Sequence, residues 1–108
     1  MPDIHPAPAP QCRIAADHPC LAGHFPGAPI VPAVVLLERV GEALRDRLND
    51  RMANCIVRAK FLHPLHPEEI ATFDFQVDAD ATRARFQCRV ESRVIARGEL
   101  AVIPVAHG

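Results

Sequence analysis

The 108-residue sequence predicts an α+β fold in which a five-stranded antiparallel sheet wraps around one long helix. Only residues 33–49 repeat their apolar positions with the period of an α-helix. A short strand pattern precedes this segment, and four more follow it, with short breaks between the last three that favour antiparallel hairpins. One helix and one such sheet must bury their apolar faces against each other, and the simplest arrangement wraps the sheet around the helix.

The first part of the chain predicts little regular structure before the helix. Residues 1–10 contain four prolines and predict an extended leader, so we expect a single domain over residues 11–108. Residues 11–17 predict a first strand with Cys12, Ile14 and Ala16 on one face. His18-Pro19 ends this strand, and residues 20–31 predict a loop.

The helix begins at a proline, because Pro32 suits a first helical turn, where an N–H group is not needed. It is expected to run to about Asn49, where Asn49-Asp50 gives a stop signal. The apolar stripe predicted to face the sheet falls at residues 33, 34, 37, 40, 41, 44 and 48.

Four strands are predicted after the helix, over residues 54–62, 70–78, 84–90 and 94–105. The first of them places Cys55, Val57, Ala59 and Phe61 on one face. The last is apolar on both faces for much of its length, which is typical of a more central strand.

Composition narrows the range of functions. The net charge is −1 and there is no basic run, so a nucleic-acid-binding protein is not expected. No apolar stretch is long enough to span a membrane, and no signal peptide is visible, which makes the cytoplasm the expected location. The four cysteines lack metal-type or redox spacing and predict reduced thiols. No metal site is expected, since the prolines beside His63 and His66 oppose the helix that their spacing would need.

The segment from His24 to Glu38 concentrates the candidate chemistry. A stiff, proline-rich loop carries His24 into the helix start, and Glu38 follows two turns later at the edge of the apolar stripe. A neutral histidine base and a protonated glutamic acid make a workable acid–base pair. The free N–H groups of the helix start can hold a carbonyl oxygen that gains negative charge. From the residues alone, a surface histidine and a solvated glutamate are the commoner outcome.

The run HFPGAPIVP, from His24 to Pro32, resembles the active-site segment of the β-hydroxyacyl-(acyl carrier protein) dehydratases of bacterial fatty acid synthesis. That family places its catalytic glutamate fourteen positions after the histidine, as Glu38 follows His24 here. The segment from Ala59 to Pro64 resembles the family's strand after the helix, and the order of elements is similar to the hotdog fold. The short chain, with little before its first strand, also resembles the dehydratase-like proteins of aryl polyene pigment clusters.

The resemblance implies that His24 removes the proton beside a thioester carbonyl and that Glu38 donates a proton to the departing β-hydroxyl group. It implies substrate contacts at five further positions: Phe25, Gly27, Pro32, Ala33 and Val34. It implies no metal or organic cofactor, an acyl carrier protein that delivers the 3-hydroxyacyl group, and a homodimer or larger oligomer, with a second hotdog chain as an alternative partner. The histidine and glutamate of one site would come from different subunits.

Several residues depart from the family pattern. The family has glycine at the position of Ala33, glutamine at that of Glu42, alanine at that of Arg39, and often Gly-Asp where this chain has Glu68-Glu69. Two other readings therefore stay open. One is a hotdog thioesterase that releases a free acid, and the other is a catalytically silent hotdog partner subunit.

Overall fold

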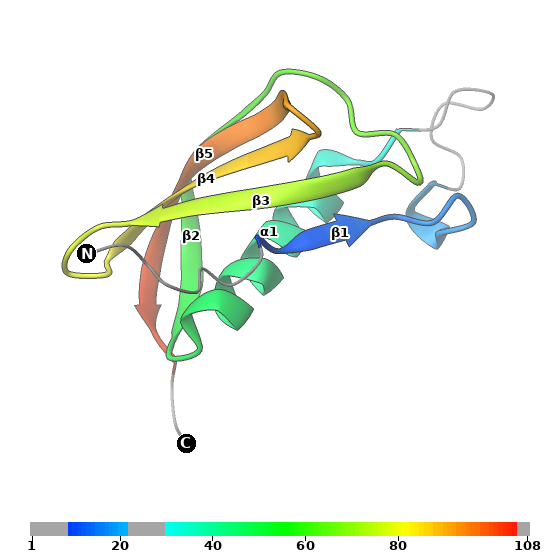
Figure 1. The fold of residues 1–108 in the computed structure, drawn as a ribbon. Coiled ribbons are helices and arrows are strands. Elements are labelled where there is room, and N and C mark those ends of the chain that lie inside the picture. The colour runs from blue at the N-terminus through cyan, green and yellow to red at the C-terminus, as the bar shows by residue number, and fades with distance from the viewer. Residues whose placement is uncertain (1–8, 22–29, 106–108) are drawn as a thin grey trace.

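The computed structural model describes residues 9–21 and 30–105, and Figure 1 shows the arrangement of their elements. In chain order these are β1 (Gln11–Arg13), the 3-10 turn η1 (Pro19–Leu21), α1 (Ala33–Leu48), β2 (Arg51–Phe61), β3 (Ile70–Val77), β4 (Arg83–Val90) and β5 (Arg93–Pro104). The expected order of strand, long helix and four strands is confirmed.

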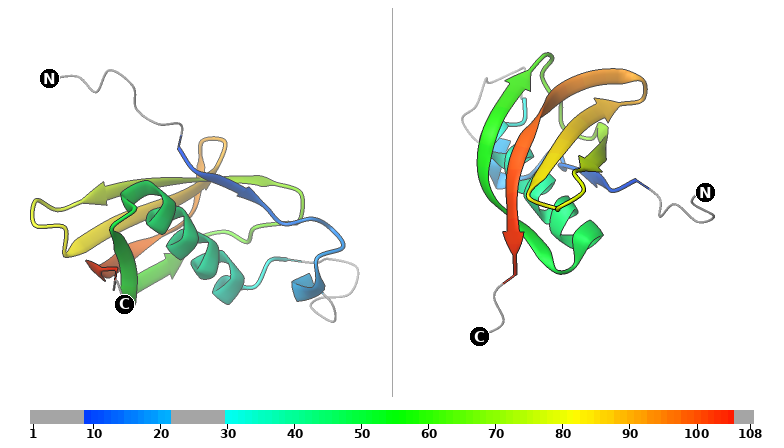
Figure 2. Two further views of the ribbon diagram at one scale, coloured as in Figure 1. Left: turned by 90° about the horizontal axis from the view of Figure 1, so that it is seen from below. Right: turned by 90° about the vertical axis from the view of Figure 1, so that its left-hand side faces the viewer.

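The strands form one antiparallel sheet in the order β1-β3-β4-β5-β2. The sheet curves around α1, which lies across its concave side (Figure 2). The prediction that the last strand is more central is confirmed, because β5 pairs with β4 on one side and with β2 on the other. The first strand is shorter than expected, but the pairing reaches back to Pro10, whose carbonyl accepts a 2.9 Å hydrogen bond from Phe73 N–H.

The two ends of α1 follow from their residues. Pro32 precedes the helix with an extended backbone (φ −60°, ψ 145°) and gives no side-chain cap. Asn49 ends it with φ 60°, and its N–H donates to the carbonyl of Arg45 at 2.9 Å. Asparagine adopts positive φ more readily than most residues, so the expected stop at this position has a conformational cause.

The core lies between α1 and the concave face of the sheet. The helix contributes its buried side chains Leu36, Val40, Ala43 and Leu44. The sheet contributes, among others, Phe73, Ala84, Phe86, Cys88, Ala96, Leu100 and Val102. The predicted stripe was partly wrong, because Ala33 and Val34 are exposed whereas Leu36 and Ala43 are buried. Among the large apolar side chains of α1, Val34 stays 63% exposed, because the sheet does not reach its side of the helix.

Strand β2 forms one edge of the sheet and is irregular. Its pairing with β5 shifts twice, between Ala53 and Cys55 and again between Ile56 and Arg58. The prediction that Cys55 and Ala59 share a face was wrong, because bulges interrupt the alternation of side chains along a strand. Four large apolar side chains of β2 are exposed: Met52, Ile56, Val57 and Phe61.

None of the helices in the described part of the chain has the length and apolar character that crossing a membrane requires.

Candidate functional site

The N-terminus of α1 opens onto a pocket of about 380 Å³. One wall is the chain entering the helix, and the other is the chain leaving β2. The lining residues are Ile30, Val31, Pro32, Ala33, Leu36, Phe61, Leu62, His63, Pro64 and Leu65. Most of these side chains are apolar, as in a pocket that accepts the hydrocarbon part of a ligand.

Backbone hydrogen bonds hold the two walls together. Val31 N–H donates to the carbonyl of Leu65 at 2.8 Å, and both side chains are buried. Beyond the end of β2, the N–H groups of Leu62 and His63 both donate to the carbonyl of Ile95, at 2.8 and 3.2 Å. Segments more than thirty residues apart therefore form one pocket with a fixed shape.

The helix α1 begins beside this pocket, and its first residue, Ala33, is one of the lining residues. Helical bonding starts with Val35 and Leu36, whose N–H groups donate to the carbonyl of Pro32 at 3.1 and 3.2 Å. Within residues 9–21 and 30–105, neither Ala33 N–H nor Val34 N–H has an acceptor. Two donors at the positive end of a helix suit a carbonyl oxygen on which negative charge develops.

Glu38 lies in the second turn of α1 and is exposed. Its carboxylate makes no hydrogen bond or ion pair with the described part of the chain. The side chain of Val34, one turn earlier, is 63% exposed. Neither of these two residues lines the pocket. The helix thus presents an unpaired carboxylate beside an uncovered apolar residue.

The structure brings together some of the residues expected at the site and not others. Pro32 and Ala33 line the pocket, and the extra methyl group of Ala33 is exposed. His24, Phe25 and Gly27 lie outside the described residues. The roles expected for them, and for Glu38, remain predictions.

Sequence reasoning missed the second wall of the pocket, from Phe61 to Leu65. A resemblance marks Ala59 to Pro64 as similar to a family strand, but no local pattern shows that this segment reaches Val31. The two segments are joined by a hydrogen bond from Val31 N–H to the Leu65 carbonyl, and a backbone contact between distant residues cannot be read from the sequence of either segment.

Two departures from the family pattern contact each other. Arg39 Nη1 lies 3.1 Å from Glu42 Oε1, an ion pair between neighbouring turns of α1. The Glu42 side chain is 63% exposed, so this is a surface ion pair, which contributes little to stability. The two unusual residues are accounted for as one local pair.

The loop before β3 is held by its two glutamates. Glu68 has φ 70°, a conformation that favours glycine, and it stands where the resembled family often has glycine. Unlike a glycine, Glu68 has a side chain that makes contacts. Its carboxylate accepts a hydrogen bond from Ala16 N–H at 2.7 Å and forms an ion pair with Arg13 at 3.0 Å. The loop is therefore tied to the end of β1.

Glu69 fixes the same loop from the other side. Its carboxylate accepts the backbone N–H of His66 at 2.8 Å and lies 3.3 Å from both His66 Nδ1 and Arg93. The backbone hydrogen bond, more than the other contacts, lowers the pKa of Glu69.

Among the described residues, no group of three or more histidine, cysteine, aspartate or glutamate side chains could hold a metal ion. Cys12, Cys55 and Cys88 are free thiols. Burial raises the pKa of Cys88 to about 12 and raises that of Cys12 as well, so neither is an activated nucleophile.

Comparisons with known proteins agree with this architecture. A family model described as ApeI-like, ApeI dehydratase, matches residues 7–99. The 3-hydroxyacyl-[acyl-carrier-protein] dehydratase FabZ of Chlamydia trachomatis is 35% identical over 108 aligned residues, which cover 88% of this chain and 71% of the relative. FabZ of Haemophilus influenzae is 48% identical over 32 residues, 30% of this chain and 22% of the relative.

Solved structures share the fold. The dehydratase heterocomplex ApeI:P from Xenorhabdus doucetiae superimposes with a TM-score of 0.73 at 20% identity, covering 85% of this chain and 82% of that chain. A 1,4-dihydroxy-2-naphthoyl-CoA thioesterase from Synechocystis superimposes with a TM-score of 0.60 at 15% identity, covering 92% and 83%. The expected hotdog fold is confirmed.

Proposed function

The chain belongs to the ApeI-like dehydratase family, and on that premise we propose that it removes water from a 3-hydroxyacyl thioester to give the trans-2-enoyl thioester. The main support for placing this reaction here is the pocket at the N-terminus of α1. Beside it, the N–H groups of Ala33 and Val34 have no acceptor among the described residues. The pathway would be fatty acid or polyene biosynthesis.

The reaction needs one base, one acid and a holder for the thioester carbonyl. We propose that His24 takes the proton from the carbon beside the carbonyl while the N–H groups of Ala33 and Val34 stabilise the negative charge on its oxygen. The carbon–carbon double bond then forms, the bond to the β-hydroxyl breaks, and Glu38 supplies the proton with which the hydroxyl leaves as water. Phe25, Gly27 and Pro32 would line the approach to the reacting atoms. Neither a metal nor an organic cofactor takes part.

A second hotdog chain would complete the site. No strand within residues 9–21 and 30–105 pairs with the outer edge of β2, and Ile56 and Val57 on this strand are 48% and 43% exposed. Strand edges of this kind are templates for pairing with another chain. Pairing along β2 would cover these side chains and allow the partner's histidine to approach Glu38. The dimer is therefore the proposed catalytic unit, built from two copies or from this chain and a related hotdog chain.

The proposed substrate is carried by an acyl carrier protein, as in the names of the FabZ relatives. The apolar pocket would accept the acyl chain beside α1. The proposal keeps the cytoplasm as the location of this reaction.

Mass spectrometry of a 3-hydroxyacyl-carrier protein after incubation tests the proposal. Loss of one water is expected. A free acid would instead indicate a thioesterase, and an unchanged substrate would indicate a silent partner subunit.

Variants locate the chemistry. His24→Ala and Glu38→Gln should each lower the rate of water loss by about 100-fold or more, the usual effect of losing a general acid or base. Glu42→Gln, at an exposed glutamate one turn further along α1, is the matched control and should keep the rate. Near-normal rates in both His24→Ala and Glu38→Gln would show that the acid–base assignment is wrong.

A further inference from the structure

A second hollow, of about 640 Å³, lies on the face of the sheet that is turned away from α1. Residues of β2, β3, β4 and β5 line it. The register places the side chains: Phe86, Gly98 and Ala59 lie in one row across the sheet, with Phe86 buried toward the helix. The charged residues on either side of this row alternate with it and therefore project from the outer face.

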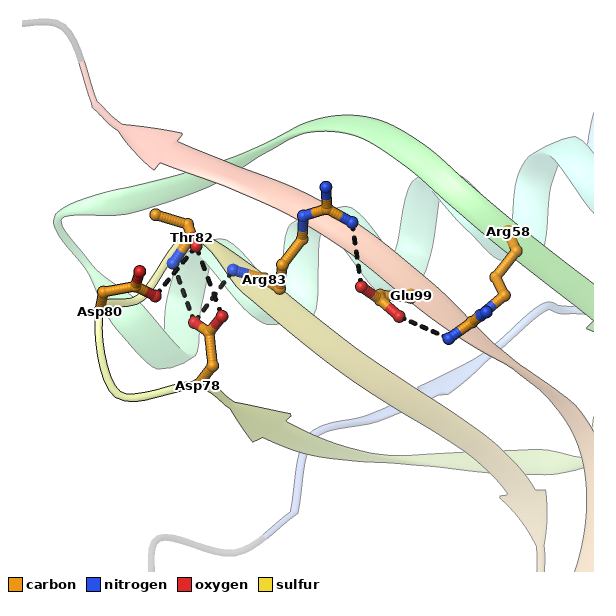
Figure 3. A network of polar contacts seen from close by, with 6 residues as sticks. All are labelled: Arg58, Asp78, Asp80, Thr82, Arg83 and Glu99. Atoms are coloured by element: carbon orange, nitrogen blue, oxygen red, sulfur yellow. Dashed lines mark hydrogen bonds and ion pairs between the residues drawn. The ribbon is translucent and has the colours of Figure 1, made fainter.

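Figure 3 shows part of this face, where Glu99 of β5 lies between Arg58 of β2 and Arg83 of β4. Glu99 accepts from Arg58 at 2.8 Å and from Arg83 at 3.0 Å. A second carboxylate of this face, that of Asp74 on β3, also has a partner, because it pairs with Arg89 at 2.9 Å. Both carboxylates therefore already form ion pairs with other arginines of the sheet.

Three cations that line the hollow have no such partner. Lys60, Arg85 and Arg97 make no ion pair with the described part of the chain. Lys60 and Arg97 stand directly opposite each other on neighbouring strands. Like charges in this position destabilise a sheet, so the arrangement costs stability unless an anion sits between them. Four cationic residues and one carboxylate line the hollow, whereas the whole chain has a net charge of −1, so positive charge is concentrated here.

We propose that this hollow, which we term the outer basic site and define by Lys60, Arg85 and Arg97, binds a small phosphorylated molecule with two or more negative charges. Two of the three cations are arginines, whose planar forks match phosphate oxygens. The three come from three adjacent strands, so one compact ligand can reach them all. The volume of about 640 Å³ is that of a small-molecule pocket. The site is separate from the dehydratase pocket and stands whether or not that proposal holds.

Inorganic pyrophosphate is the probe, used with the full chain at low ionic strength in titration calorimetry and thermal unfolding. Saturable binding that weakens as salt is added is expected. Arg97→Gln should weaken this binding by about 10-fold or more, the effect of losing one charge-assisted contact. Arg97→Gln should also raise the melting temperature of the free protein by about 1–4 °C, because it removes the repulsion with Lys60.

Arg45→Gln is the matched control, since Arg45 is an exposed arginine on α1. It should alter neither the affinity for pyrophosphate nor the melting temperature. A raised melting temperature in Arg97→Gln would show that the variant folds, so that a loss of binding can be attributed to the site.

Three outcomes would overturn the proposal. One is the absence of saturable binding by pyrophosphate. Another is equal affinity in Arg97→Gln and Arg45→Gln. The third is binding to phosphatidylglycerol vesicles, or to an acidic protein, that pyrophosphate does not displace, because a flat contact surface would then explain the charge.

Discussion

Gly98 is the position where one added methyl group should disturb the sheet most. A Cβ atom there would lie 2.3 Å from the carbonyl oxygen of Arg58 and 2.6 Å from Cε2 of the Phe86 ring. Phe86 is 3% exposed and packed in the core, and the Arg58 oxygen belongs to the backbone of β2. Neither neighbour moves away cheaply, since core rings and strand backbones are closely packed.

Two contributions decide the size of the effect of Gly98→Ala. Overpacking costs about 1–3 kcal/mol, whereas the reduced entropy of the unfolded chain returns about 0.4–1 kcal/mol. The clash dominates, so the net loss should be about 1–2 kcal/mol, or about 5–15 °C in melting temperature for a domain of this size.

Gly41→Ala is the matched comparison, because a Cβ atom at Gly41 in α1 meets nothing within 4 Å. It should stabilise the protein by about 0.5–1 kcal/mol, the usual gain within a helix. Thermal and urea unfolding measure both variants. In the double variant Gly98→Ala/Phe86→Leu the loss should be smaller than the sum of the two single losses, because the smaller side chain relieves one clash while the Arg58 oxygen stays in place. Equal signs for the two alanine variants would refute the reasoning.

Two further predictions concern titratable groups. The contacts of Glu69 with His66 lower its pKa in the folded protein, so its ionised form stabilises the fold. This contribution is present at pH values above the unfolded-state pKa and is lost as the pH falls through the folded-state pKa. At neutral pH, urea unfolding should give Glu69→Gln a free energy of unfolding about 0.5 kcal/mol below that of wild type, and this difference should vanish in acid. A difference that stays constant with pH would contradict the prediction. At pH 8, iodoacetamide should label exposed Cys55 at least about ten times faster than buried Cys88, whose pKa is about 12, as peptide mass spectrometry would show; equal rates in the folded protein would contradict it.

The order of elements could be predicted because each is encoded locally. A single period-3.6 segment and several period-2 segments give the helix and strands, and Asn49 and Pro32 mark the helix ends. The buried face of α1 could not be chosen correctly. Val34 and Leu36 are both apolar, and only the position of the sheet determines that Leu36 is buried while Val34 stays open.

The faces of β2 could not be predicted for a related reason. Two shifts in its pairing with β5 decide which side Cys55 and Ala59 occupy, and these shifts depend on hydrogen bonds between strands. At the candidate site, the His24–Glu38 segment was visible because its prolines and its spacing are local. The wall formed by Phe61 to Leu65 was not, because the hydrogen bond from Val31 to Leu65 joins distant segments.

The start of α1 places stability and activity in conflict. A serine or aspartate in place of Pro32 would offer the cap that the helix lacks, a gain of about 1 kcal/mol in an ordinary helix. Such a side chain would accept the N–H of Val34 or Val35, and Val34 is one of the two donors that the proposed reaction needs for its oxyanion. Anyone engineering a more heat-resistant form of this protein should therefore leave this helix end alone, although it is an obvious place to gain stability, and seek improvement at positions such as Gly41.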